Sequence, residues 1–334
     1  MNFIFRRLGI ALLTVVLVSF LSFIAFDIIP GDPVSVILGT EASSEQIAAL
    51  REELGLDRNI FVRYIFWLKN FCSGNPGNSI RFRGEPVAAM IQERLPVSIA
   101  LAVLSLVFIL LIAVPVSVFS VQPHRNTAHK RFHAGTIIDR IINALTAFGV
   151  SIPGFFLGVL FIWIFGISFK WFIPGVYTPY QENFFGFISS LVFPALAVAI
   201  PNAAVLIKFL RSNLLHELKS DYVRTVRSKG AGSAYTLHRH ALKNALIPTL
   251  AVLGMIIAEI FSGSIVIEQV FTIPGIGRLL IAVIRSHDFP VIQALVVYIA
   301  WTVVIANTLV DIAIQMIDPR IRLGKQTFRE VVRS

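Results

Sequence analysis

The chain has 334 residues, of which 56% are apolar and 14% are charged, and its mean hydropathy is +0.77. Soluble domains carry about 25% charged residues, so this composition excludes an ordinary soluble domain and indicates an integral membrane protein. Lysine and arginine number 29 against 19 aspartates and glutamates, an excess that first suggests nucleic acid or anionic lipid as a partner.

About six apolar stretches have the length of roughly 20 residues that a helix needs to cross a membrane. They cover residues 8–28, 99–120, 145–167, 188–210, 246–267 and 291–317. Arg6 and Arg7 precede the first stretch as in a cleaved signal peptide, but "IPGDP" follows where small residues would mark a cleavage site. We therefore expect a retained first span and an all-α, polytopic fold with one transmembrane domain.

Basic residues in the short loops predict the orientation of the chain. They gather before the first span, after the second, fourth and sixth, while the opposite short loops hold only Lys170, Arg278 and Arg285. We expect both termini in the cytoplasm and a positive charge that sets topology, with no role for nucleic acid. The predicted organisation is a tail and first helix over 1–29, an extracytoplasmic loop or cap over 30–98, a core transmembrane domain over 99–317 and a cytoplasmic tail over 318–334.

The extracytoplasmic connection contains a helix-like segment, "SSEQIAALREELGL". Ser44 can cap this helix, and Ile47, Leu50 and Leu54 form a stripe on one face. We expect a small folded cap outside the membrane, with a disordered loop as the alternative.

A long basic stretch, "DYVRTVRSKGAGSAYTLHRHALKNALIP", separates the fourth and fifth spans. An apolar side chain recurs at every fourth position, which predicts one helix face made of Leu214, Leu218, Tyr222 and Val226. Gly230 and Gly232 then let the backbone leave the helix, and Ser233 can cap a second one. Two helices around a glycine break favour docking onto another protein over a solvated loop.

The same stretch belongs to an ordered set of motifs. "DYVRTVRSKG" is followed by "HALKNALIP", with Gly230 eighteen residues before Pro248. The other motifs are "IPGDPV", "LREELGLD", "RLPVS" and "SIP" before it, and "VFTIPGIGRLL", "DFPVIQ", "NTLVD" and "DPRIR" after it. Over nearly its whole length the chain resembles permease subunits of the dipeptide, oligopeptide and nickel branch of bacterial ABC importers. It departs mildly at Val226 and Ser228, where that branch usually has alanine.

The resemblance implies an ABC-importer permease fold whose coupling segment, about residues 213–245, sits in a groove of an ATPase subunit. In this segment the Gly230 turn would present the second helix to the ATPase. The residues implied to couple to the ATPase are Asp221, Tyr222, Arg224, Arg227, Lys229, Gly230, His240 and Asn244. The implied partners are a second, related permease, two ATP-binding subunits, an extracytoplasmic substrate-binding protein and membrane lipid.

The implied function is translocation of di- and oligopeptides across the bacterial cytoplasmic membrane by alternating access. Similar permeases carry nickel or other metal complexes, glutathione and small solutes, so these cargoes stay as alternatives. An ion-driven secondary transporter is a further alternative, because Glu259 lies in the fifth span and could be a proton site.

Motifs for chemistry are missing from the sequence. The only Gly-Lys pair, Gly324 and Lys325, is followed by glutamine, so no phosphate-binding loop exists. We expect no enzyme activity and no cofactor in this chain, with ATP and magnesium on partner subunits. His129 and His133 have metal-ligand spacing but no third ligand nearby, and a single cysteine, Cys72, excludes an intramolecular disulfide.

Breaks and charges inside the spans point to a translocation path. Pro153, Pro194 and Pro201 are expected to interrupt the third and fourth spans. A carboxylate at mid-span costs about 2–3 kcal/mol, so Glu259 should line the path and favour cationic substrate, or be a protonated group bonded across a helix interface.

The outer connection between the fifth and sixth spans contains "FTIPGIGRLL". Its proline and glycines predict a rigid turn with apolar flanks, in a re-entrant or scaffold loop. By resemblance this loop would lie near the gate, with Pro274, Gly275, Gly277 and Arg278 as its site residues.

Overall fold

Long apolar stretches fold as helices because a helix satisfies its own backbone hydrogen bonds in lipid. The computed structural model describes residues 2–28, 58–82, 84–121 and 137–317, with the single positions 43, 45 and 48. No strand occurs among these residues, which confirms the predicted all-α class. The helix expected around Ser44, the pair His129 and His133, and the tail after residue 317 lie outside the described residues.

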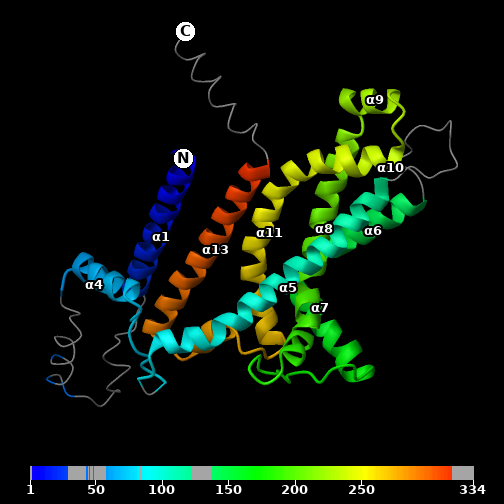
Figure 1. Ribbon diagram of the computed structural model, residues 1–334. Coiled ribbons are helices and arrows are strands. Elements are labelled where there is room, and N and C mark those ends of the chain that lie inside the picture. Colours follow the sequence, from blue (N-terminus) through cyan, green and yellow to red (C-terminus); the bar gives the residue numbers. More distant parts are fainter. Residues whose placement is uncertain are drawn as a thin grey trace, which may run out of the picture. The chain divides into compact units, whose positions relative to one another are not determined.

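The helices follow one another along the chain as Figure 1 shows. They are α1 (Asn2–Ile28), α4 (Ile60–Cys72), α5 (Val87–Val121), α6 (Ile137–Ser151), α7 (Gly154–Phe161), the π-helix η1 (Ile162–Ser168), α8 (Phe184–Glu217), α9 (Asp221–Ser228), α10 (Ser233–Thr236), the π-helix η2 (Leu237–Ala241), α11 (Leu242–Val270), α12 (Ile276–Arg285) and α13 (Phe289–Ile317).

Five described helices are long and apolar enough to cross a membrane, and a bent pair makes a sixth span if it is counted as one. The bend of 98° lies between α6 and α7–η1, where Pro153 adopts an extended conformation (ψ 138°). Proline disfavours helical backbone in the residue before it, which explains the break after Ser151. The prediction of about six spans, with an interruption at Pro153, is confirmed.

The expected interruption of the fourth span is wrong, because α8 runs without a break through Pro194 and Pro201. A proline removes one backbone donor, so the carbonyl four residues earlier loses its partner. For Pro201 that carbonyl belongs to Ala197, and it lies only 3.1 Å from where a Cβ of Gly154 would be. The missing side chain of Gly154 lets α7 pack closely over this part of α8.

The chain divides into two compact units, residues 1–99 with 274–305 and residues 100–273 with 306–334. In the first unit the start of α5, α12 and the start of α13 share a buried cluster that includes Val87, Met90, Val283 and Leu295. In the second unit α8 is the central helix, since 61% of its membrane window is buried, against 28% for α11. The helices α6, α7 and α11 pack around α8.

Candidate functional site

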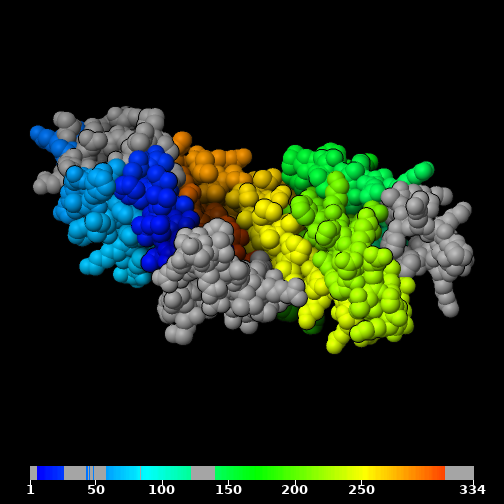
Figure 2. Space-filling model, turned by 90° about the horizontal axis from the view of Figure 1, so that it is seen from above, coloured from blue at the N-terminus to red at the C-terminus, as the bar shows by residue number. Residues whose placement is uncertain are grey.

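The predicted coupling segment forms a helical loop at one end of the second unit, and α9 stands clear of the longer helices there (Figure 1). Figure 2, seen from that end, shows the yellow-green surface of this segment uncovered. The two helices around a glycine break are confirmed. Only α9 is a separate helix, however, because α10 continues through η2 into α11, and Ser233–Val270 forms one span.

The apolar residues at every fourth position do not form one helix face, so that expectation is wrong. The helix stops between α8 and α9, and the spacing therefore does not carry over from one to the other. Leu214 and Leu218 are buried, whereas Tyr222 and Val226 are only half-buried. The buried residue of α9 is Val223, which is 0% exposed.

The end of α9 is fixed by a turn that requires glycine. Gly230 has φ +86°, its N–H donates to the carbonyl of Arg227 at 2.9 Å, and the N–H of Ala231 donates to the carbonyl of Val226 at 3.4 Å. These two bonds are the Schellman arrangement that ends many helices with a left-handed glycine. The prediction that the backbone leaves the helix at Gly230 is confirmed, and the reason is this conformation.

The second glycine has a different role. Gly232, and not Ser233, is the residue before α10, and no side chain caps that helix, so the expected Ser233 cap is wrong. Gly232 has an ordinary φ of −65°, and a Cβ added to it would meet nothing within 4 Å. Its position therefore does not require glycine.

A tyrosine joins α9 to the end of α8. The hydroxyl of Tyr222 donates to the carboxylate of Glu217 at 2.5 Å. Burial, followed by the hydrogen bond to Glu217, raises the pKa of Tyr222 above its usual 10.0. Since Glu217 ends α8, Tyr222 ties α9 to that helix. Sequence reasoning missed Glu217, which no local pattern pairs with Tyr222.

The coupling segment packs on a buried apolar cluster. It joins the end of α5 to α8, η2 and α11, and contains Val118, Val121, Leu210, Leu214, Leu218, Leu237, Ala241 and Ala245. Close packing of this kind resists deformation. The loop therefore rests on a rigid base.

The eight predicted coupling residues divide equally between an exposed and a half-buried group. Asp221, Arg224, Lys229 and Gly230 are exposed, and Tyr222, Arg227, His240 and Asn244 are half-buried. Arg224 and Asp221 form an ion pair of 3.6 Å with side chains 79% and 98% exposed, which contributes little to stability. His240 packs edge-on against Tyr235, with 5.7 Å between ring centroids. The exposed group forms a charged surface around the end of α9.

Glu259 lies on an unpartnered face of α11. Met255 (64% exposed) and Val266 (45%) share this face, and a Cβ at Gly263 would meet nothing within 4 Å. The Glu259 carboxylate is exposed and forms no hydrogen bond with any residue that the structure describes. The alternative is that Glu259 is a protonated carboxyl bonded across a helix interface. Within the described part of this chain, no group is placed to accept or donate that hydrogen bond.

The connection between α11 and α12 turns at a residue that the sequence did not indicate. Thr272 has φ 60°, whereas Gly275 is extended (φ −101°) at the start of α12. Gly275 and Gly277 are buried, and Pro274 and Arg278 are half-buried. The turn is therefore confirmed, but its left-handed residue is Thr272, and Gly275 and Gly277 are not among the glycines with positive φ.

A buried carboxylate holds the connection between α4 and α5 to the start of α13. Asp288 is 0% exposed and accepts hydrogen bonds from the Ser79 hydroxyl and from the N–H groups of Ile80 (3.2 Å) and Arg81 (3.2 Å). The Arg81 side chain also donates to the carbonyl of Ser286 at 3.0 Å. "DFPVIQ" marked Asp288 as a family match, but nothing in the sequence linked it to Ser79. We call this contact the Asp288 clasp.

In the described part of the chain, no three His, Cys, Asp or Glu side chains gather as a metal site would require. The helices thus define a polytopic α-helical membrane protein with a charged, exposed helical loop around α9. Residues 127–323 match the family described as binding-protein-dependent transport system inner membrane component, and residues 1–102 match the N-terminal family of the same membrane components. The chain belongs to this family of transport components and is a multi-pass inner membrane protein.

Several relatives match almost from end to end. A probable peptide ABC transporter permease protein, y4tP of Sinorhizobium fredii, is 34% identical over 96% of this chain and 99% of its own length. The oligopeptide transport system permease protein AppB of Bacillus subtilis is 35% identical over 96% and 98%. A putative peptide transport system permease protein of Brucella abortus is also 35% identical over 96% and 98%.

Proposed function

We propose that this chain is a permease subunit of an ATP-driven importer of di- and oligopeptides. The observation that carries the proposal is the match, over 96% of the chain, to relatives named as peptide permeases. Cargo could differ among proteins this similar, and nickel complexes or other small solutes are the alternative. In either case the chain would supply the path, while ATP is hydrolysed on partner subunits.

We propose that α9 and the Gly230 turn dock onto an ATPase subunit. Three observations support this role: α9 is a separate helix, its surface is charged and exposed, and its base is a packed apolar cluster. A rigid base would transmit movement of the ATPase to α8 and α11, which both contribute residues to this cluster. The docking element is then α9 rather than the second helix, because α10 belongs to the fifth span.

The complete importer would contain a second, related permease, two ATP-binding subunits and an extracytoplasmic binding protein. Its chain termini would lie in the cytoplasm with the basic loops. The exposed face of α11 around Glu259 would then line the path between the permeases, because a mid-span carboxylate requires a polar path or a partner group.

The test is a gentle detergent pull-down of the tagged chain, followed by ATPase assay of the co-purifying proteins and by peptide uptake in cells. Arg224→Glu reverses an exposed charge on α9, and Arg285→Glu is the matched control, since Arg285 is exposed on α12 in the other unit. We expect Arg224→Glu to lose the ATPase and uptake, and the control to keep both. An intact chain that brings down no ATPase, together with uptake abolished by an uncoupler, would favour the ion-driven transporter.

A further inference from the structure

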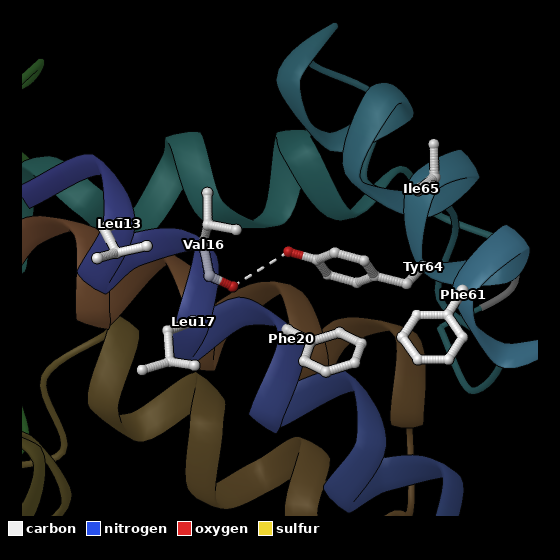
Figure 3. A pocket seen from close by; sticks show the side chains of 7 residues that line it. All are labelled: Leu13, Val16, Leu17, Phe20, Phe61, Tyr64 and Ile65. Atoms are coloured by element: carbon white, nitrogen blue, oxygen red, sulfur yellow. Dashed lines mark hydrogen bonds between the residues drawn. The ribbon is translucent and has the colours of Figure 1, made fainter. Parts of the chain in front are cut away.

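The helix α4 follows the first span and lies in the connection that the sequence predicts to be an extracytoplasmic cap. Its contacts with α1 are inside the apolar window of that span, Arg6–Ala25. The hydroxyl of Tyr64 donates to the carbonyl of Val16 at 3.1 Å and shares a hydrogen bond of 2.7 Å with the Ser19 hydroxyl. Figure 3 shows Tyr64 reaching across to α1 in this way.

The position of Val16 gives the depth of this contact. Val16 is ten residues after Arg6 and nine before Ala25, which places it about 15 Å and about 14 Å from the ends of the window at 1.5 Å per residue. A tyrosine hydroxyl at that depth has no water to bond, and Val16 and Ser19 supply the partners that it needs. Tyr64 itself is only 7% exposed.

Aromatic contacts extend from mid-membrane toward the C-terminal end of α1. The ring of Phe20 stacks on Phe61 at 5.6 Å, and Phe23 contacts Tyr64 at 5.6 Å and Trp67 at 6.0 Å. These contacts follow α1 toward Ala25, so α4 lies beside the half of the span nearest Ile28 (Figure 1). An element outside the membrane could not make them without drawing α1 out of the lipid.

The opposite face of α4 is apolar and exposed. Val62 (43% exposed) and Phe66 (56%) point away from α1, while Phe61 (60%) and Ile65 (62%) are exposed beside α1. Amphipathic helices that lie in the interface of a bilayer bury such a face among the acyl chains. The position of Arg63 agrees with this depth. Its guanidinium lies 5.7 Å from the ring centroid of Phe23, near the end of the apolar window, where a long basic side chain can reach the membrane interface.

A groove of about 340 Å³ runs between the two helices (Figure 3). Its walls are Leu13, Val16, Leu17 and Phe20 of α1 and Phe61, Tyr64 and Ile65 of α4. Because Tyr64 turns its hydroxyl to Val16 and Ser19, the groove presents hydrocarbon. Leu13 and Leu17 are 67% and 53% exposed, so the groove opens away from the described protein at the depth of the acyl chains.

We propose that α4 is embedded in the bilayer leaflet that surrounds the C-terminal half of α1, and that the groove between them binds an acyl chain of a phospholipid from that leaflet. The depth of Val16 and the apolar walls select an acyl chain as the occupant. The proposal is independent of the cargo of the importer. It also restricts the extracytoplasmic cap to residues other than those of α4.

Depth is tested first on the full chain in nanodiscs. Cys72 is the only cysteine, so Cys72→Ser gives a background for single labels at Ile65→Cys on α4 and Glu85→Cys, an exposed control in the following loop. A spin label at position 65 should be relaxed mainly by oxygen, which concentrates in lipid, and a label at position 85 mainly by a water-soluble nickel chelate. Equal access of the chelate to both labels would overturn the embedding of α4.

Occupancy is tested with phosphatidylcholine that carries a diazirine on its acyl chain. Leu17→Trp fills the groove, whereas Leu12→Trp adds the same bulk to another exposed position of α1 outside it (67% exposed, against 53% for Leu17). Cross-linking of peptides from α4 should fall several-fold with Leu17→Trp and stay unchanged with Leu12→Trp. Equal cross-linking in both variants, or a photoreactive residue at position 65 that captures residues 30–57 in place of lipid, would overturn the lipid site.

Discussion

The Gly230 turn offers the sharpest test of the proposal that α9 docks onto an ATPase subunit. Gly230 has φ +86°, a backbone conformation that costs about 1–2 kcal/mol for a residue with a Cβ. No atom lies within 4 Å of an added Cβ, so Gly230→Ala changes backbone strain alone and introduces no clash. Gly232→Ala is a matched control, because Gly232 has φ −65° and equally open space.

Strain of this size alters docking by a predictable factor. A cost of 1.4 kcal/mol corresponds to a tenfold change in an equilibrium constant, so the full strain of about 1–2 kcal/mol should weaken ATPase binding by about 5- to 30-fold in Gly230→Ala. Gly230→Asn should retain more binding, since asparagine tolerates the left-handed conformation better than alanine does. The assay titrates purified ATPase onto the tagged chain in nanodiscs and measures the bound fraction.

The pattern across the three variants decides the result. We expect binding to decrease from wild type and Gly232→Ala through Gly230→Asn to Gly230→Ala. If Gly230→Ala bound the ATPase as tightly as wild type, the Schellman turn would not shape the docking surface. If Gly232→Ala were equally impaired, the loss would reflect added bulk and the strain argument would fail.

Three further predictions concern other parts of the chain. Asp288→Asn removes a charged acceptor from the Asp288 clasp, so thermal unfolding should show a loss of about 1.5–3 kcal/mol, while the exposed Glu85→Gln should change it by less than about 0.5 kcal/mol. The folded pKa of Tyr222 is raised, so its stabilisation is present below pH 10.0 and is lost as the pH rises through the folded pKa. Fluorescence of a label near the end of α9 should report this alkaline loosening, and Tyr222→Phe should abolish the transition. Glu259→Gln should reduce uptake of cationic peptides about fivefold relative to neutral ones, the effect of about 1 kcal/mol of lost attraction.

Each of these predictions has an outcome that would contradict it. Unchanged unfolding of Asp288→Asn would mean that water replaces the clasp. An alkaline transition that persists in Tyr222→Phe would assign it to another group. Equal loss of cationic and neutral peptides with Glu259→Gln would give the carboxylate a structural role instead of a place on the path.

Local patterns in the sequence determined much of this protein. The apolar runs predicted the spans, because a helix in lipid must be continuous and apolar. Pro153 and Gly230 predicted breaks that the structure contains, because each restricts or frees its own backbone regardless of distant residues. The ordered motifs identified the family over nearly the whole chain.

Only the tertiary structure decided which local signals prevail. Pro194 and Pro201 do not break α8, which is buried around Pro194 and packed against α6, α7 and α11. Likewise, Ser79 and Asp288 are 209 residues apart and share no local pattern, so only folding brings the hydroxyl to the carboxylate. The sequence determined which conformations each backbone segment can adopt by itself. Contacts between distant segments decided which of these conformations the folded chain has, because packing energies exceed most local preferences.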